Sequence, residues 1–260
     1  MKLRIRFSKH GTVRFIGHLD IQRYFQRLNR RAGIKVVYSE GFSPHQKMSF
    51  AMPLSVGYES DAEYFDIEVA EALSSADVME RMNREQAEGI EVSECVKLPD
   101  GAENAMASVR AADYIVGFRQ GNEPPFDIKG AISGISGPEP FIAKKPVKRS
   151  GRKGRISKAS YNTRSMNDKA GEEMPEYREI DIRPFILGIT CGDDGRIRMK
   201  VSAGSKDNIK PELVIGALYE RAGYELPPHA LMITRHELYT DEGDGNGKEL
   251  IPLYKAGERF

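Results

Sequence analysis

The order of predicted strands and helices constrains the fold of this chain more than any other feature. Alternating polar and apolar residues predict strands at 2–7, 48–52, 65–69 and 90–97. Apolar residues at helical spacing predict helices at 21–32 and 76–84. The order is therefore strand, helix, two strands, helix and strand, which is the βαββαβ order of a ferredoxin-like unit.

A similar order recurs after residue 110. The predicted strands are 114–118, 139–143, 180–190, 196–203 and 231–238, and the predicted helices are 126–133 and 211–222. The string GDDG joins two of these strands as a hairpin, whereas Gly130 and Gly134 disfavour the first helix. We therefore predict an α+β protein made of two tandem ferredoxin-like domains, 1–105 and 106–260.

One segment of the second domain is strongly basic. Residues 144–169 contain ten Lys or Arg and one acid, Asp168, so the segment carries +9 although the whole chain carries +1. It is also poor in apolar residues and rich in Gly and Ser, so burial cannot offset its ordering entropy. We predict an inserted mobile loop at about 144–174. It either tethers a phosphate backbone or is a solvated loop without a dedicated ligand.

Composition excludes several classes of protein. The chain is 40% apolar and 30% charged, as globular proteins are, and no stretch approaches the length of a membrane span. Cys95 and Cys191 lie far apart, which argues against a zinc site, an iron–sulfur cluster or a disulfide scaffold. Nucleotide-binding and common hydrolase motifs are missing. We expect a cytoplasmic protein without a membrane segment, metal or cofactor.

Polar residues crowd the ends of predicted elements between residues 13 and 69. His18 and Asp20 stand where a helix should begin, and a following turn carries Ser43, His45, Lys47 and Ser49. If His18 and His45 meet, they can act as acid and base, as in metal-independent cleavage of RNA. A divalent metal bound by these histidines and Asp20 is a weaker alternative. In the structural alternative, Asp20 and His18 only stabilise or cap the helix terminus.

Basic residues on predicted outer faces are candidates for binding an anionic substrate. They are Arg4, Arg6, Arg14, Arg23, Arg27, Arg30, Arg31, Arg183, Arg196, Arg198, Lys200, Lys206 and Lys210. Open sheets flanked by basic side chains are a known RNA-binding arrangement. The alternatives are charges that serve solubility, an ion pair for Arg183, and an ordinary capped helix start near Lys206 and Lys210.

Several unusual strings occur together and in a recognisable order. They are RFSKHGTVRFIGHLD at 6–20, RRAGIKVVYSEGFSPHQKMSFAMPLSVGYES at 30–60, AEYFDIEV at 62–69, EIDIRPFI at 179–186 and NIKPELVIGAL at 208–218. In these the chain resembles the radical SAM-linked proteins, whose shared domain is a bacterial domain of unknown function. The resemblance implies a B12-binding-type radical SAM protein as partner, and for some members a nearby ribonuclease of the E/G type. It carries no catalytic residue, and the basic insertion departs from the family pattern.

The radical chemistry itself must belong to the partner. Such enzymes hold a cluster with three closely spaced cysteines, which this chain lacks. We expect a non-catalytic substrate-binding or adaptor protein that presents RNA or another anionic substrate to a radical SAM partner. The alternatives are a metal-independent RNA-processing enzyme using His18 and His45, and a scaffold that binds only proteins.

Overall fold

The computed structural model describes residues 1–260 except 73, 138, 147–176, 205–207 and 242–248. Most of the predicted basic loop and Lys206 therefore lie outside the described residues. The strands are β1 Lys2–Lys9, β2 Met48–Phe50, β3 Glu59–Glu68, β4 Ile90–Lys97, β5 Ala111–Phe118, β6 Ile142–Pro146, β7 Tyr177–Asp181, β8 Ile186–Cys191, β9 Ile197–Ser202, β10 Leu231–Asp241 and β11 Leu250–Pro252. The helices are α1 His18–Arg31, α2 Ser75–Arg84, α3 Ala105–Ser108, α4 Ile128–Ser133 and α5 Pro211–Arg221, with short 3-10 turns η1 Gly11–Phe15, η2 Gly134–Ser136, η3 Arg183–Phe185 and η4 Leu253–Ala256.

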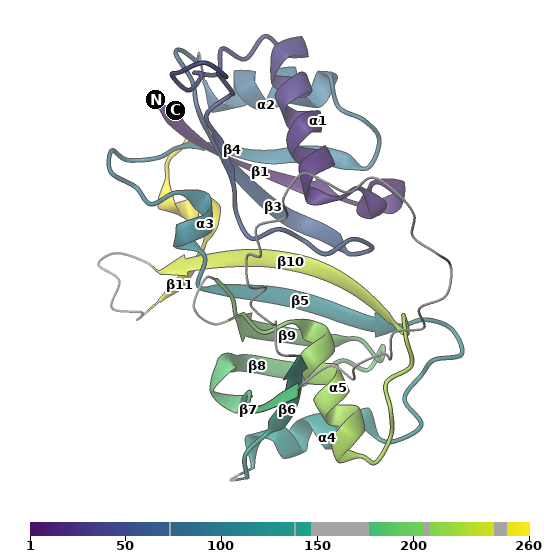
Figure 1. Cartoon of the computed structure of the whole chain (residues 1–260). Coiled ribbons are helices and arrows are strands. Elements are labelled where there is room, and N and C mark those ends of the chain that lie inside the picture. Colours follow the sequence, from purple (N-terminus) through teal and green to yellow (C-terminus); the bar gives the residue numbers. More distant parts are fainter. Residues whose placement is uncertain (73, 138, 147–176, 205–207, 242–248) are drawn as a thin grey trace, which may run out of the picture.

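The protein is a mixed α+β structure built on one large sheet. Seven strands follow the order β4-β1-β3-β10-β5-β9-β8, while β2 pairs with β3 and β11 pairs with β10. All pairings in this sheet are antiparallel except that of β3 with β10, which joins the two halves of the chain. Figure 1 shows this joint near the middle of the molecule. The halves thus share a continuous sheet.

Each half has its own hydrophobic core. In the first, Phe7 of β1 packs with Phe25 of α1 and Met82 of α2. In the second, Met199 of β9 packs with Leu218 of α5. Figure 1 shows α1 and α2 beside the first half of the sheet, and α4 and α5 beside the second.

Strand register places both cores on the same face of the sheet. Phe7 lies opposite Glu63, and Arg235 lies opposite Tyr114, which in turn lies opposite Met199. Arg235 donates a hydrogen bond to Glu63 across the joint, so all of these side chains lie on one face of the sheet. We call this side the helix face and the opposite side the open face, which α3 and η4 cover only in part.

The predicted strand at 180–190 is wrong in one respect, because the chain bends in its middle. β7 ends at Asp181, the 3-10 turn η3 follows, and β8 begins at Ile186. Pro184 lacks the N–H that a continuous sheet pairing would need, so the strand divides there. β7 pairs with β6 in a separate two-stranded sheet, and β8 joins the large sheet.

No helix among the described residues combines the length and apolar character needed to cross a membrane.

Candidate functional site

The parallel joint between the halves, which we call the seam, is short and irregular. Only Thr234 with Glu59 and Arg235 with Ser60 pair across it. A β-bulge in β10 makes His236 an extra residue against β5, and another in β3 places Asp61 and Ala62 opposite one residue of β1. Bulges redirect side chains and are frequent beside active sites. Because both bulges lie at the seam, we take the seam as the candidate functional site.

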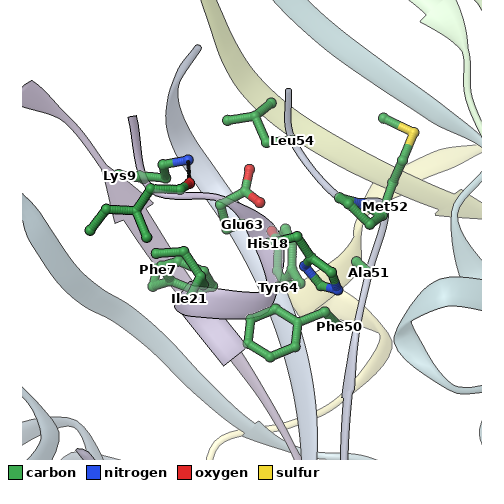
Figure 2. Close-up of a pocket in the computed structure, with 12 residues that line it drawn as sticks. Phe7, Lys9, His18, Ile21, Phe50, Ala51, Met52, Leu54, Glu63 and Tyr64 are labelled. Atoms are coloured by element: carbon green, nitrogen blue, oxygen red, sulfur yellow. Dashed lines mark hydrogen bonds between the residues drawn. The ribbon is translucent and has the colours of Figure 1, made fainter. Parts of the chain in front are cut away.

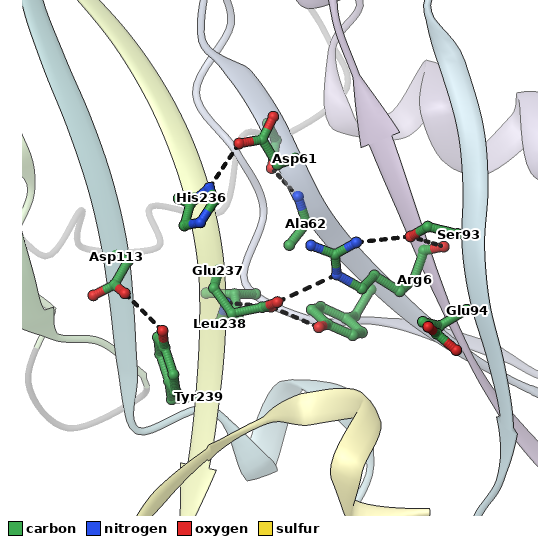
Figure 3. Close-up of polar contacts among 12 residues, drawn as sticks. Arg6, Asp61, Ala62, Ser93, Glu94, Asp113, His236, Glu237, Leu238 and Tyr239 are labelled. Carbon is green, nitrogen blue, oxygen red and sulfur yellow. Dashed lines mark hydrogen bonds and ion pairs between the residues drawn. The ribbon is translucent and has the colours of Figure 1, made fainter. Parts of the chain in front are cut away.

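On the open face of the seam, side chains from both halves form a polar network (Figure 3). The Tyr64 hydroxyl donates to Glu237 Oε1 at 2.6 Å, and Arg6 Nε donates to Glu237 Oε2 at 3.3 Å. Arg6 also donates to Ser93 Oγ at 2.8 Å. Burial and the adjacent Glu237 carboxylate raise the pKa of Tyr64 well above its ordinary value. The phenol therefore stays protonated and holds the two halves together.

Two histidines share one carboxylate beside this network. His236 Nδ1 lies 2.8 Å from Asp61 Oδ2, and His10 Nε2 lies 3.1 Å from Asp61 Oδ1. Figure 3 shows the His236 ring directed at Asp61 across the seam. No hydrogen-bond partner among the described residues reaches Nε2 of His236. An imidazole oriented in this way can bind an anion when protonated or transfer a proton.

On the helix face, the seam buries charged groups. Arg235 is fully buried and donates hydrogen bonds to Glu63 and, at 3.0 Å, to the Met52 carbonyl. Lys9 is also buried and donates to the Ile16 carbonyl at 3.1 Å. Burial lowers the pKa of Lys9, while the nearby Glu63 carboxylate acts in the opposite direction.

His18 lines a small cavity at this buried cluster (Figure 2). Its ring meets Phe50 edge-on, with ring centroids 5.4 Å apart. The cavity volume is about 20 Å³, which is room for about one water molecule. This small cavity cannot admit a substrate without rearrangement.

A larger groove lies on the open face of the second half. It has a volume of about 290 Å³, and its polar lining residues are Asp113, Thr190, Arg198, Lys200 and His236. Arg198 is exposed, and no carboxylate of the described residues lies within ion-pair distance of it. Lys200 lies 3.8 Å from the centroid of the Tyr239 ring and 3.7 Å from Asp113 Oδ2. The groove therefore presents two basic side chains beside His236, of which Lys200 is paired with Asp113 and Arg198 is not paired within the described part of the chain.

Of two arginines predicted to bind an anion, the structure buries one and pairs the other with an acidic side chain. Arg4 is buried and binds Asp66 through Nε at 2.8 Å and Nη2 at 3.1 Å, so a substrate cannot reach it. Arg6 is engaged by Glu237 and Ser93. Both arginines face acidic groups from neighbouring strands, which sequence alternation alone did not reveal. Their charges stabilise the sheet.

His18 and His45 are not brought together. Gln46, next to His45, donates to the Gln26 carbonyl of α1 at 3.0 Å. Gln26 lies two turns after His18, roughly 12 Å along the helix axis. The exposed His45 instead contacts Ser39 Oγ at 2.9 Å. The predicted acid–base pair does not form in this arrangement.

The other predicted residues are dispersed. Asp20 is exposed near Arg23, Arg14 binds Glu59 at 3.1 Å, Lys47 binds Glu68 at 2.9 Å, Ser43 lies in the exposed loop, and Ser49 lies on β2. Lys210 is the exposed N-cap residue of α5. Buried Nε and Nη2 of Arg183 have no hydrogen-bond partner among the described residues. Among those residues, no group of three or more His, Cys, Asp or Glu is arranged to hold a metal ion.

Sequence reasoning missed His10, Asp61, His236 and Glu237. A signal was available in β10, where the charged string RHE interrupts the apolar strand LMITRHELY. A run of charge inside a predicted strand indicates a bulge or a paired polar site. Nothing in the sequence identified Asp61 as the partner of two histidines.

Comparison with known proteins finds one family and no curated relative. No curated protein matches the chain. A family model described as an uncharacterised protein conserved in bacteria (DUF2344) matches residues 2–211. The match includes β1, β3 and β9 but ends at Pro211, the first residue of α5, and so omits His236. Since it covers most of the chain, this protein belongs to the DUF2344 family of uncharacterised bacterial proteins.

Proposed function

We propose that this protein binds RNA or another anionic substrate and presents it to a radical SAM partner. The observation that carries the proposal is the groove on the open face, where Arg198 and Lys200 stand beside His236. Clustered cations gain affinity for a phosphate backbone by releasing counterions. The five sequence strings that resemble radical SAM-linked proteins support the identity of the partner.

The groove suits a phosphate-bearing strand. Gly188 and Thr190 of β8 lie opposite Lys200 and Arg198 of β9, so the cations adjoin a residue without a side chain and a hydroxyl group. The backbone of a nucleic acid can approach closely at glycine, and threonine can donate to a phosphate oxygen. The basic segment 144–169 adds a further source of phosphate affinity.

In this proposal each half of the chain, 1–105 and 106–260, is a ferredoxin-like domain. The order β4-β1-β3 with β2 beside β3 supports this for the first half, and the order β10-β5-β9-β8 supports it for the second. Each is the strand order of a split βαβ unit, with the β6–β7 hairpin as an insertion. The groove then occupies the open sheet face of the second domain.

The binding proposal is tested by fluorescence anisotropy with a labelled single-stranded RNA between 50 and about 200 mM salt. We expect Arg198→Gln with Lys200→Gln to weaken binding about tenfold and to reduce the salt slope by about 0.7 for each lost phosphate contact. Arg84→Gln is the matched control, because Arg84 is an exposed arginine of α2 that pairs with Glu80. Equal affinity and slope in the double variant and the control would contradict the proposal.

The partner is tested separately by affinity capture of the tagged chain from a bacterial extract under anaerobic conditions, with and without ribonuclease. We expect the wild type and the Arg198→Gln, Lys200→Gln variant to recover the same radical SAM protein, because the groove and the partner surface are distinct in this proposal. If the variant loses RNA but keeps the partner, the result supports both RNA binding by the groove and the adaptor role. Recovery of no radical SAM protein would reject the adaptor role.

A further inference from the structure

A second cavity lies where the two halves meet, away from the groove. Its volume is about 510 Å³, within the range of small-molecule sites. The first half contributes Phe15 of η1 and residues 55–58, and the second half contributes Glu212 of α5 and residues 226–231. Neither half alone forms the cavity.

Two polar atoms at this cavity are buried without partners. No hydrogen-bond partner among the described residues reaches Glu212 Oε2 or the Tyr58 hydroxyl. A buried polar atom without a partner costs free energy, so such atoms in native proteins call for an explanation. The residues that carry these atoms, Tyr58 of the first half and Glu212 of the second, both line the cavity. A ligand that donates hydrogen bonds from the cavity would give either residue a partner.

The buried carboxyl group of Glu212 favours a ligand that is a cation. Burial raises the pKa of Glu212, since the apolar surroundings disfavour its charged form. A cationic donor would restore the charged carboxylate and form a charge-assisted hydrogen bond. Arg119, also at the cavity, does not provide this, because its Nε donates to the His229 carbonyl and it makes no ion pair with Glu212 among the described residues.

One wall of the cavity is apolar, whereas Ser55, Arg119 and His229 add polar groups to its lining. Leu226, Pro227 and Ile233 form its wall, and the side chains of Phe15 and Val56 are exposed at its margin. An aliphatic chain can cover this surface while its cationic end reaches inward.

We propose that this cavity binds an alkylammonium or alkylguanidinium group, with the cation at Glu212 and Tyr58 and the aliphatic chain along the apolar wall. The group can belong to a small amine or to a lysine or arginine side chain of a protein partner. This site is independent of the RNA groove, so either proposal can fail alone.

Titration calorimetry with hexylamine and with hexanol tests the proposal. Hexanol has the same chain without the charge, so we expect it to bind at least tenfold more weakly than hexylamine. Glu212→Gln should reduce hexylamine affinity at least tenfold, to the level of hexanol. Glu225→Gln should leave it unchanged, because Glu225 is an exposed residue outside the cavity. Equal binding of the two probes, binding of neither, or no effect of Glu212→Gln would overturn the proposal.

Two further measurements keep the test decisive. Tyr58→Phe should weaken hexylamine binding several-fold. It provides a second variant if circular dichroism shows that Glu212→Gln does not fold.

A blocked Leu-Leu-Lys peptide, compared with Leu-Leu-Gln, distinguishes the sources of the cation. Tighter binding of the lysine peptide than of hexylamine supports a protein partner, and the reverse order supports a free amine.

Discussion

The two faces of the seam contain similar residue types but use them differently. On the helix face, Arg235 is fully buried, and Glu63 and Lys9 are buried with it. On the open face, His236 and Asp61 form a hydrogen-bonded pair, and 57% of the His236 side chain and 34% of the Asp61 side chain are exposed. Strands β3 and β10 supply both pairs, and Lys9 comes from the end of β1. Burial therefore separates charges that stabilise the joint from charges that are free to meet a ligand.

This difference gives the seam two roles. A buried ion pair is costly to form but still more costly to break, because the remaining charge is left without solvent or partner. An exposed pair contributes little to stability and can exchange its partner for a ligand. Substitutions on the two faces should therefore affect different measurements.

The largest effect is expected for Glu63→Leu. This change leaves the Arg235 guanidinium buried without its carboxylate, so we expect the free energy of unfolding to fall by about 3–5 kcal/mol in urea denaturation. The double variant Glu63→Leu with Arg235→Met should recover most of the loss, since no charge then remains buried.

Glu94→Gln is the control on the open face. Glu94 pairs with Arg259, whose side chain is 63% exposed, so the expected loss is a small fraction of the loss for Glu63→Leu. Similar losses for Glu63→Leu and Glu94→Gln would remove the distinction between the faces.

A smaller loss is expected for Tyr64→Phe. The change removes the 2.6 Å hydrogen bond to Glu237, which is worth about 2 kcal/mol because its acceptor is charged. The raised pKa of Tyr64 also predicts a pH effect. Above about pH 10 the unfolded phenol loses its proton while the folded one keeps it, so wild-type stability falls as pH rises.

Urea denaturation between pH 8 and about 11 tests this. Tyr64→Phe should show a shallower alkaline decline than the wild type, and Tyr239→Phe should cost less at neutral pH because Tyr239 is only half-buried. An equally steep decline in Tyr64→Phe would show that Tyr64 does not cause it.

The regular elements of the first half could be predicted from sequence. Alternation predicted a strand at 2–7, where β1 lies, and helical spacing predicted a helix at 21–32, where α1 lies, each within a few residues of the observed bounds. These signals are local, because a side chain's face depends only on the period of its own element. The division of the strand at 180–190 was signalled only by Pro184.

The candidate site could not be predicted in the same way. The pairing of Asp61 with His10 and His236 depends on two bulges and on a parallel seam between residues about 175 positions apart. Strand register across such a separation is set by tertiary packing, and local periodicity carries no information on it. His18 and His45 were predicted to pair because they lie close together in the sequence. In the structure His18 lies beside Phe50 of β2, whereas Gln46 binds the Gln26 carbonyl and keeps the neighbouring His45 near a later part of α1.

A modest pH effect is expected for Lys9→Met. Burial lowers the pKa of Lys9 below its unfolded value, so the unfolded state binds more protons between those two values. Wild-type stability relative to the variant should therefore rise as pH increases toward about 10.4, with a slope below 1.36 kcal/mol per pH unit. Urea denaturation of both proteins from pH 7 upward measures the difference. If the difference in free energy of unfolding stays constant across this range, burial does not lower the pKa of Lys9.

The smallest effect on stability is expected for His236→Gln. Its pair with Asp61 is largely exposed, so the free energy of unfolding should change by less than about 0.5 kcal/mol. RNA binding should respond, because the His236 imidazole lines the groove beside Arg198 and Lys200 and can donate a hydrogen bond to a phosphate oxygen. We expect RNA binding about threefold weaker than in the wild type, measured by fluorescence anisotropy. His45→Gln is the matched control, since it removes an exposed histidine far from the groove. Weaker binding in His45→Gln but not in His236→Gln would move the ligand to the loop at 41–49, whereas unchanged affinity in both variants would mean that neither histidine contacts RNA.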